Sequence, residues 1–172
     1  ADEHGLDVPE NTPDQLKIAT EYGAFSIADT GGSRIRLAIE TDTSDNLHIL
    51  RDSLVGHIEH FLPQVAEKIV WSDEIKDGGT PPNFQFTKVL AVSDLCSDFV
   101  RVTLRLSKPE LFSDQAIHFR FVLPDQADPE PEWPTLAANG ATRWPKGDKA
   151  LHRPVYTARR QSDDAIDVDV FC

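Results

Sequence analysis

A chain of 172 residues is long enough for one generous domain or two small ones, and 40% hydrophobic with 27% charged residues is an ordinary globular composition. No apolar run approaches the roughly 20 residues that a membrane-spanning helix needs, which excludes a helical membrane protein. The net charge of −12 repels nucleic acid and anionic membranes and excludes both as general partners.

The cysteine content predicts a reducing compartment. Cys96 and Cys172 are too few for a disulfide framework and lack metal-finger spacing, and no export signal opens the sequence, so we expect a cytoplasmic protein. Cys96 lies near the end of an expected strand and is predicted to be a small buried residue. The chain has no methionine and stops inside an apolar alternation at Phe171, so we expect it to be truncated.

The first elements in chain order predict a small α/β unit. Residues 13–22 form a possible short helix. Residues 24–28 and 34–41 predict two strands, the second because apolar and polar residues alternate along it. The turn residues 30–33 contain two glycines, which accept the positive φ values of a tight hairpin turn.

A long amphipathic helix follows. Ser44 or Asp45 can cap its start, and Pro63 stops it. The apolar residues on one face recur at the helical period: Leu47, Leu50, Leu54, Ile58 and Phe61. His57 and His60 share this helix, but no Cys or acidic partner accompanies them at a metal-binding spacing, so we expect surface or interdomain histidines and no metal site.

A linker separates this unit from the rest of the chain. Residues 76–82 combine glycines with two prolines, which continue neither a helix nor an interior strand. We therefore expect a small α/β domain at residues 1–77 and a second domain at 84–172. Residues 1–80 carry 6 basic against 16 acidic residues and residues 81–172 carry 11 against 13, so the two halves differ electrostatically.

The second half has the two-residue period of strands. Apolar residues alternate with polar ones along 100–106, 117–123 and 166–170. Short strands with turn-rich connections predict an antiparallel barrel or sandwich.

The connection over residues 124–151 has no periodicity but holds five prolines and two tryptophans. Because Trp133 and Trp144 are costly to expose, we expect part of this connection to fold against the barrel or a ligand. Residues 143–160 carry six basic residues and one acidic residue, which is a basic region in an acidic protein.

Residues 153–159 read Arg-Pro-Val-Tyr-Thr-Ala-Arg and are the strongest local signal. A flavin ring stacks on aromatic side chains such as Tyr156, its N5 and O4 edge accepts hydrogen bonds from a hydroxyl such as that of Thr157, and its pyrophosphate needs cations such as Arg153 and Arg159. The alternative is a solvated edge strand whose basic side chains discourage edge pairing. No nucleophile elbow and no Gly-rich phosphate loop is present, so no catalytic residue is predicted.

These residues resemble the flavin domain of the siderophore-interacting family, within the ferredoxin-reductase superfamily. That superfamily carries an arginine, a variable residue, tyrosine, and then serine or threonine. The segment 118–124, His-Phe-Arg-Phe-Val-Leu-Pro, and the alternation over 165–171 are also similar to the family. One departure is that Arg153 precedes Tyr156 by three positions, whereas the common pattern has the arginine two positions before, where Pro154 stands.

The resemblance implies a role for each site residue. Tyr156 packs on the isoalloxazine ring, Thr157 bonds near N5, and Arg153 or Arg159 approaches the phosphates. His118 lies opposite the core-facing residues of its strand and either lines the flavin or faces solvent. The implied fold is an α+β N-terminal unit followed by an all-β antiparallel Greek-key barrel.

The implied function is that of an FAD-dependent ferric-siderophore reductase, which releases iron with electrons from NAD(P)H or a ferredoxin-like donor. The alternatives are a flavin reductase with another acceptor and a non-catalytic binding module. A nicotinamide-binding domain is expected beyond the C-terminus. The N-terminal unit resembles a small domain of unknown function through its strand 34–41, its helix residues His57 to Phe61, and Trp71, and this resemblance supplies no activity.

Overall fold

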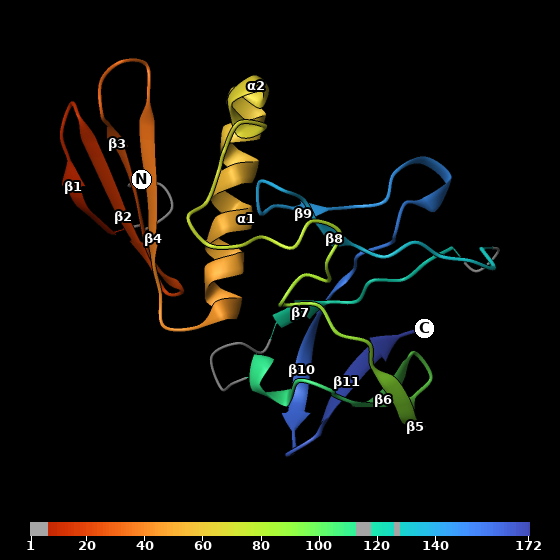
Figure 1. Cartoon of the computed structure of the whole chain (residues 1–172). Coiled ribbons are helices and arrows are strands. Elements are labelled where there is room, and N and C mark those ends of the chain that lie inside the picture. Colours follow the sequence, from red (N-terminus) through yellow and green to blue (C-terminus); the bar gives the residue numbers. More distant parts are fainter. Residues whose placement is uncertain (1–6, 113–117, 126–127) are drawn as a thin grey trace. The chain divides into compact units, whose positions relative to one another are not determined.

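The computed structural model describes residues 7–112, 118–125 and 128–172 (Figure 1). The chain forms two compact units. The first contains Ala1–Pro82 and Thr135–Arg143, and the second contains Asn83–Pro134 and Trp144–Cys172. The domains expected at residues 1–77 and 84–172 stay a prediction, and residues 135–143 group with the first unit.

An antiparallel sheet opens the first unit. Its strands are β1 (Asp7–Asn11), β2 (Gln15–Thr20), β3 (Gly23–Asp29) and β4 (Ile35–Glu40), in the order β1-β2-β3-β4. The hairpin expected around residues 30–33 is confirmed by the pairing of β3 with β4.

The helix expected at residues 13–22 is wrong, because this segment contains strand β2. Strand β2 pairs in continuous register with β3 from Gln15 to Thr20, and this pairing decides its structure. Helical propensity is a weak signal that such pairing overrides.

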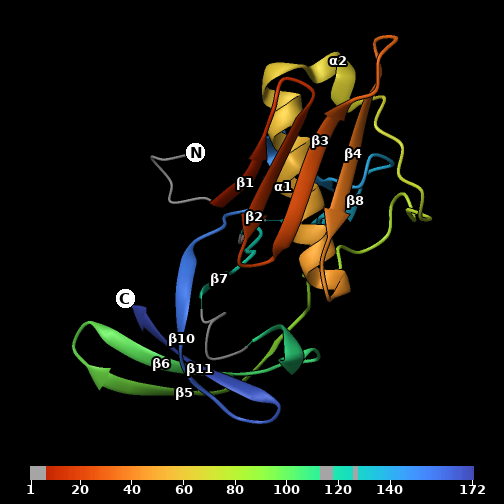
Figure 2. The same ribbon diagram turned by 90° about the vertical axis from the view of Figure 1, so that its left-hand side faces the viewer.

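Helix α1 (Ser44–Phe61) covers one face of the sheet, as Figure 2 shows. Its cap is Thr43, whose hydroxyl accepts the Asn46 amide at 3.2 Å, so neither Ser44 nor Asp45 is the cap. Pro63 ends α1 as expected and starts the short helix α2 (Pro63–Ala66). The buried face of α1 includes Leu50, Leu54 and Val55.

A hairpin from the long connection completes the first unit. Strands β8 (Thr135–Leu136) and β9 (Thr142–Arg143) pair with each other. Leu136 also exchanges backbone hydrogen bonds with Gly78 and Gly79, at 2.9 and 2.7 Å. These bonds hold part of the expected linker, residues 76–82, within the unit.

The second unit is built on a five-stranded antiparallel sheet with the order β5-β6-β11-β10-β7. The strands are β5 (Lys88–Cys96), β6 (Phe99–Arg105), β7 (His118–Arg120), β10 (Val155–Gln161) and β11 (Ala165–Phe171). Two 3₁₀ turns, η2 (Pro109–Leu111) and η3 (Gly147–Lys149), lie in its connections.

The strands expected at 100–106 and 166–170 are confirmed as β6 and β11. The described part of the segment 117–123 forms a strand only at β7, after which Phe121 and Leu123 donate backbone bonds to Pro154 and His152. Within the described residues, β5 and β7 are the two edges of the sheet, so these strands do not close the expected Greek-key barrel.

One face of this sheet carries the core of the second unit. The buried residues of the core are Leu104, Leu106, Ile166 and Val168, and Phe112, Phe119, Phe121, Tyr156 and Ala158 pack around them. Cys96 is exposed, so its expected burial is wrong. It ends β5, an edge strand whose residues are all exposed because it pairs with β6 alone.

Candidate functional site

Strand β10 presents different chemistry on its two sides. Tyr156 and Ala158 are half-buried and pack around the core, whereas Thr157 and Arg159 are exposed. This alternation follows from the two-residue period of a strand. The polar face of the sheet therefore carries Thr157 and Arg159, and the core face carries Tyr156.

His118 and Thr157 form a cross-strand pair on the polar face. They stand directly opposite each other where β7 pairs with β10, and His118 Nδ1 lies 2.9 Å from Thr157 Oγ1. Both residues are exposed. The structure thus brings together two of the residues that the sequence singled out separately.

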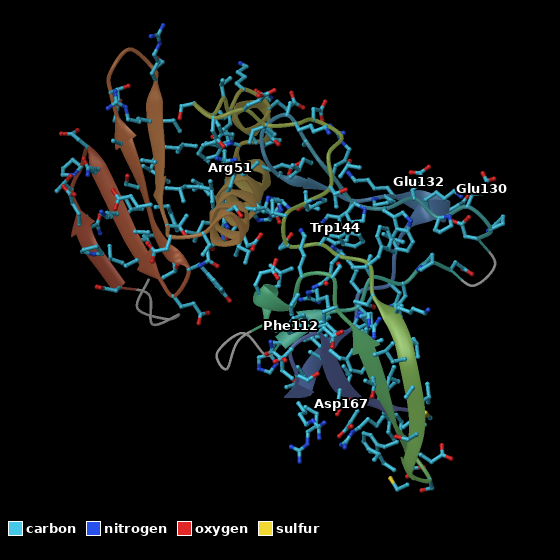
Figure 3. All side chains as sticks on the ribbon, turned by 60° about the horizontal axis from the view of Figure 1, so that its bottom comes forward. Arg51, Phe112, Glu130, Glu132, Trp144 and Asp167 are labelled. Atoms are coloured by element: carbon cyan, nitrogen blue, oxygen red, sulfur yellow. The ribbon has the colours of Figure 1, made fainter. Side chains whose placement is uncertain are left out.

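A β-bulge near the end of β10 changes the direction of its basic side chains. The pairing with β11 shifts between Ala158 and Arg160, so that Arg159 is the extra residue. Arg160 stands opposite Asp167, and its Nε lies 3.8 Å from a carboxylate oxygen of that residue. Asp167 also accepts the Thr103 hydroxyl at 2.8 Å, and Figure 3 shows Asp167 on the sheet of this unit.

Arg101 and Asp169 form a bidentate ion pair on the neighbouring strands β6 and β11. Arg101 Nε and one terminal nitrogen donate to the two Asp169 oxygens at 2.7 and 2.9 Å. The hydrogen bond from Arg101 holds the pKa of Asp169 below its usual range, and the positive charges of Arg101 and Arg159 add to this effect. Asp169 is therefore ionised, and Arg101 compensates its charge.

An open concavity of about 680 Å³ lies over this region. Its lining consists of Val155, Tyr156, Thr157, Ala158, Arg159 and Asp169. Because Arg101 neutralises Asp169, Arg159 contributes the net charge, and the concavity suits an anionic ligand.

Tyr156 lies on the other side of the strand from Thr157. Its ring meets that of Phe121 edge to face, with the centroids 5.0 Å apart, and Phe121 meets Phe119 at 5.1 Å. The Tyr156 ring and the Thr157 hydroxyl therefore face opposite sides of β10.

Arg153 does not line the concavity. Its guanidinium carbon lies 4.3 Å from the ring centroid of Trp144, a cation–π contact, and its carbonyl accepts a bond from Arg120 at 3.2 Å. Trp133 packs with Phe84 and Phe86 at 6.1 and 5.1 Å. Both tryptophans of the long connection thus pack within the second unit, as expected for part of that segment.

Sequence reasoning missed Arg101 and Asp169 as part of this site. Both are polar residues within strands that the sequence predicts from alternating apolar and polar residues. The sequence therefore places each of them on the polar face of its strand. Their pairing depends on the register of β6 against β11, which the sequence alone did not supply.

Within the described residues, no group of three or more His, Cys, Asp and Glu side chains is arranged to hold a metal ion. His57 and His60 are both exposed on α1, and His57 Nδ1 lies 2.7 Å from the Ser53 carbonyl. No helix in the described part of the chain is long and apolar enough to span a membrane.

Comparison with protein families finds a match to the siderophore-interacting FAD-binding domain over residues 88–172. This range begins with β5 and includes every strand of the five-stranded sheet. No curated protein and no solved structure matches the chain significantly. The family match supports FAD as cofactor and a flavin-related, oxidoreductase-type function. Residues 88–172 therefore match the siderophore-interacting FAD-binding domain, which supports the resemblance of this part of the chain to the siderophore-interacting family.

Proposed function

We propose that the protein is an FAD-dependent oxidoreductase that reduces ferric siderophores. The observation that carries this proposal is the concavity on β10, where Thr157 and Arg159 stand within the matched FAD-binding domain. FAD, when bound, accepts two electrons from a donor and can pass them on singly, which is the chemistry that reduction of Fe(III) needs. The iron is substrate and needs no protein ligand.

The residues of the concavity fit FAD. The Thr157 hydroxyl, assisted by His118, offers a hydrogen bond to the polar edge of the ring, and Arg159 offers a guanidinium to the pyrophosphate. Among the described residues, Asp169 is the one anion that lines the concavity, and its bidentate pair with Arg101 limits its repulsion of phosphate. Tyr156 contributes its ring edge from the core side of the strand. Arg153, stacked on Trp144, is the more distant candidate for a phosphate contact.

The remaining parts of the proposal come from the family. The electron donor is NAD(P)H or a ferredoxin-like protein, the acceptor is a ferric siderophore, and the reaction takes place in the cytoplasm. We propose that the five-stranded sheet of the second unit is part of a Greek-key barrel.

The test starts with FAD binding to the protein. We expect FAD absorbance and fluorescence to change on binding, and reduced protein to be reoxidised by a ferric siderophore faster than by a free ferric chelate. Arg159→Ala should weaken FAD binding, whereas Arg105→Ala should not, because Arg105 is an exposed arginine of β6 paired with Asp164 at 3.6 Å.

Two results would count against the proposal. Absence of FAD binding would remove the flavin function altogether. If FAD binds tightly but no ferric siderophore oxidises the reduced protein, the flavoprotein assignment stands and the ferric siderophore is not the substrate.

A further inference from the structure

The exposed pair on the polar face, His118 and Thr157, supports an inference about the flavin site. The two side chains are fixed relative to each other because β7 and β10 place their Cα atoms directly opposite. The contact joins Nδ1 of the imidazole to Oγ1 of the hydroxyl at 2.9 Å, an ordinary hydrogen-bond distance.

Only one hydrogen can lie between these two atoms. When Nδ1 carries it, as in the protonated imidazole, the hydroxyl oxygen accepts that bond and its own hydrogen is available to another acceptor. When the neutral imidazole carries its hydrogen on Nε2, the hydroxyl donates to Nδ1, and Thr157 can offer only its lone pairs to a ligand. The state of His118 therefore decides whether Thr157 donates or accepts.

We propose that His118 is a positioning residue that sets the direction of the Thr157 hydrogen bond to the flavin, an inference that rests on the proposed flavin function. The N5 atom of a flavin accepts a hydrogen bond in the oxidised form and carries a hydrogen in the reduced form. Protonated His118 makes Thr157 a donor, which suits oxidised FAD. Neutral His118 with its hydrogen on Nε2 makes Thr157 an acceptor, which suits reduced FAD.

Other charged groups share this face and act on both redox states of FAD. Arg120 stands two residues from His118 on β7, and Arg159 stands two residues from Thr157 on β10. The Arg101–Asp169 pair lies on the neighbouring strands β6 and β11. Protonation of His118 adds one positive charge to them, which attracts the FAD phosphates whatever the redox state. The hydrogen-bond direction is distinguished from this general attraction because it requires the Thr157 hydroxyl and favours opposite redox states.

The experiment measures the dissociation constants of oxidised and of dithionite-reduced FAD between about pH 5.5 and 8.5, the range in which histidine ordinarily changes charge. The variants are His118→Gln, which cannot titrate, Thr157→Val, which lacks the hydroxyl, and Thr157→Ser, which keeps it. Comparison with Thr157→Val at each pH removes the titration of FAD itself. Nitrogen NMR of the His118 ring without FAD reports the state of Nδ1 directly.

In wild type and in Thr157→Ser, we expect the preference for oxidised over reduced FAD to fall by about three- to tenfold from acid to alkaline pH, the worth of one ordinary hydrogen bond. This pH dependence should be absent in His118→Gln and Thr157→Val. In Thr157→Val the ring nitrogen signals of His118 should also shift.

Each remaining outcome has a definite reading. If FAD binds and its redox preference has the same pH dependence in Thr157→Val as in wild type, the charge of His118 alone explains the effect. This result overturns the inference, while the proposed function stands. A His118 ring that is unaffected by loss of the Thr157 hydroxyl also overturns it. Failure of FAD to bind at any pH overturns the proposed function and this inference with it.

Discussion

Gly140 is the position where one added methyl group should disturb the first unit most. It lies between β8 and β9 with φ +82°, a left-handed conformation that favours glycine. A Cβ here would overlap Arg51 Cδ and come within 3.0 Å of Trp71 Nε1. We predict that Gly140→Ala strongly destabilises this unit.

The magnitude follows from what holds Arg51 in place. Arg51 is only 7% exposed, donates to Asp73 at 2.8 Å and lies over the Trp71 ring at 4.5 Å. The left-handed backbone alone costs alanine about 1–2 kcal/mol. Displacing Arg51 from a buried, partnered position costs about 1–3 kcal/mol more, so we expect a total loss near 3 kcal/mol.

Gly31 supplies the matched control, because its φ is +78° and nothing lies within 4 Å of the Cβ it would gain. Gly31→Ala should therefore lower the free energy of unfolding only by the cost of the left-handed backbone conformation. The assay is urea denaturation of both variants in a Trp133→Phe, Trp144→Phe background, where the fluorescence of Trp71 reports on the first unit. Equal losses of unfolding free energy in the two variants would refute the packing of residues 135–143 on Arg51.

Three further predictions concern pH, charge and the core. Burial lowers the pKa of His48, so the unfolded state binds a proton at this residue more readily than the folded state does. The first unit should therefore lose stability as the pH falls through about 6.5, which denaturation midpoints measure. The variant His48→Gln should not show this pH dependence. Arg159→Ala should weaken FAD binding about tenfold and lessen its salt dependence by isothermal titration, and an unchanged salt dependence would show that Arg159 does not face the phosphates. Leu104→Ala should cost about 2–5 kcal/mol of unfolding free energy, whereas Leu95→Ala should stay within about 0.5 kcal/mol, since Leu104 is 3% and Leu95 46% exposed.

The elements that the sequence predicted well are those with uninterrupted periodicity. Strands β6 and β11 each keep one period over their whole length, so local pattern and tertiary packing agree. Helix α1 forms as predicted, but its expected apolar stripe is buried only in part: Leu50 and Leu54 are buried, whereas Phe61 is 73% exposed. The segment that forms β2 was misread because its apolar positions are few, and its partner β3 decides its structure. The exposure of Cys96 depends on which strand stands at the edge of the sheet, a property of topology rather than of local sequence.

The candidate site shows the same limit. His118, Thr157 and Arg159 were recognised by residue type, and their exposed positions agree with the alternation of their strands. The contact between His118 and Thr157, and the Arg101–Asp169 pair, depend on strand register across many residues of sequence. Residues 135–143 belong to the first unit because side chains pack around Arg51. The periodicity of the sequence does not predict this packing.

The central claim is that FAD binds over β10, and hydrogen–deuterium exchange with and without FAD tests it most directly. We predict that FAD slows amide exchange in residues 155–159 and 118–120 and leaves strands β1 to β4 unchanged. FAD binding that leaves exchange in β7 and β10 unaltered would contradict the account.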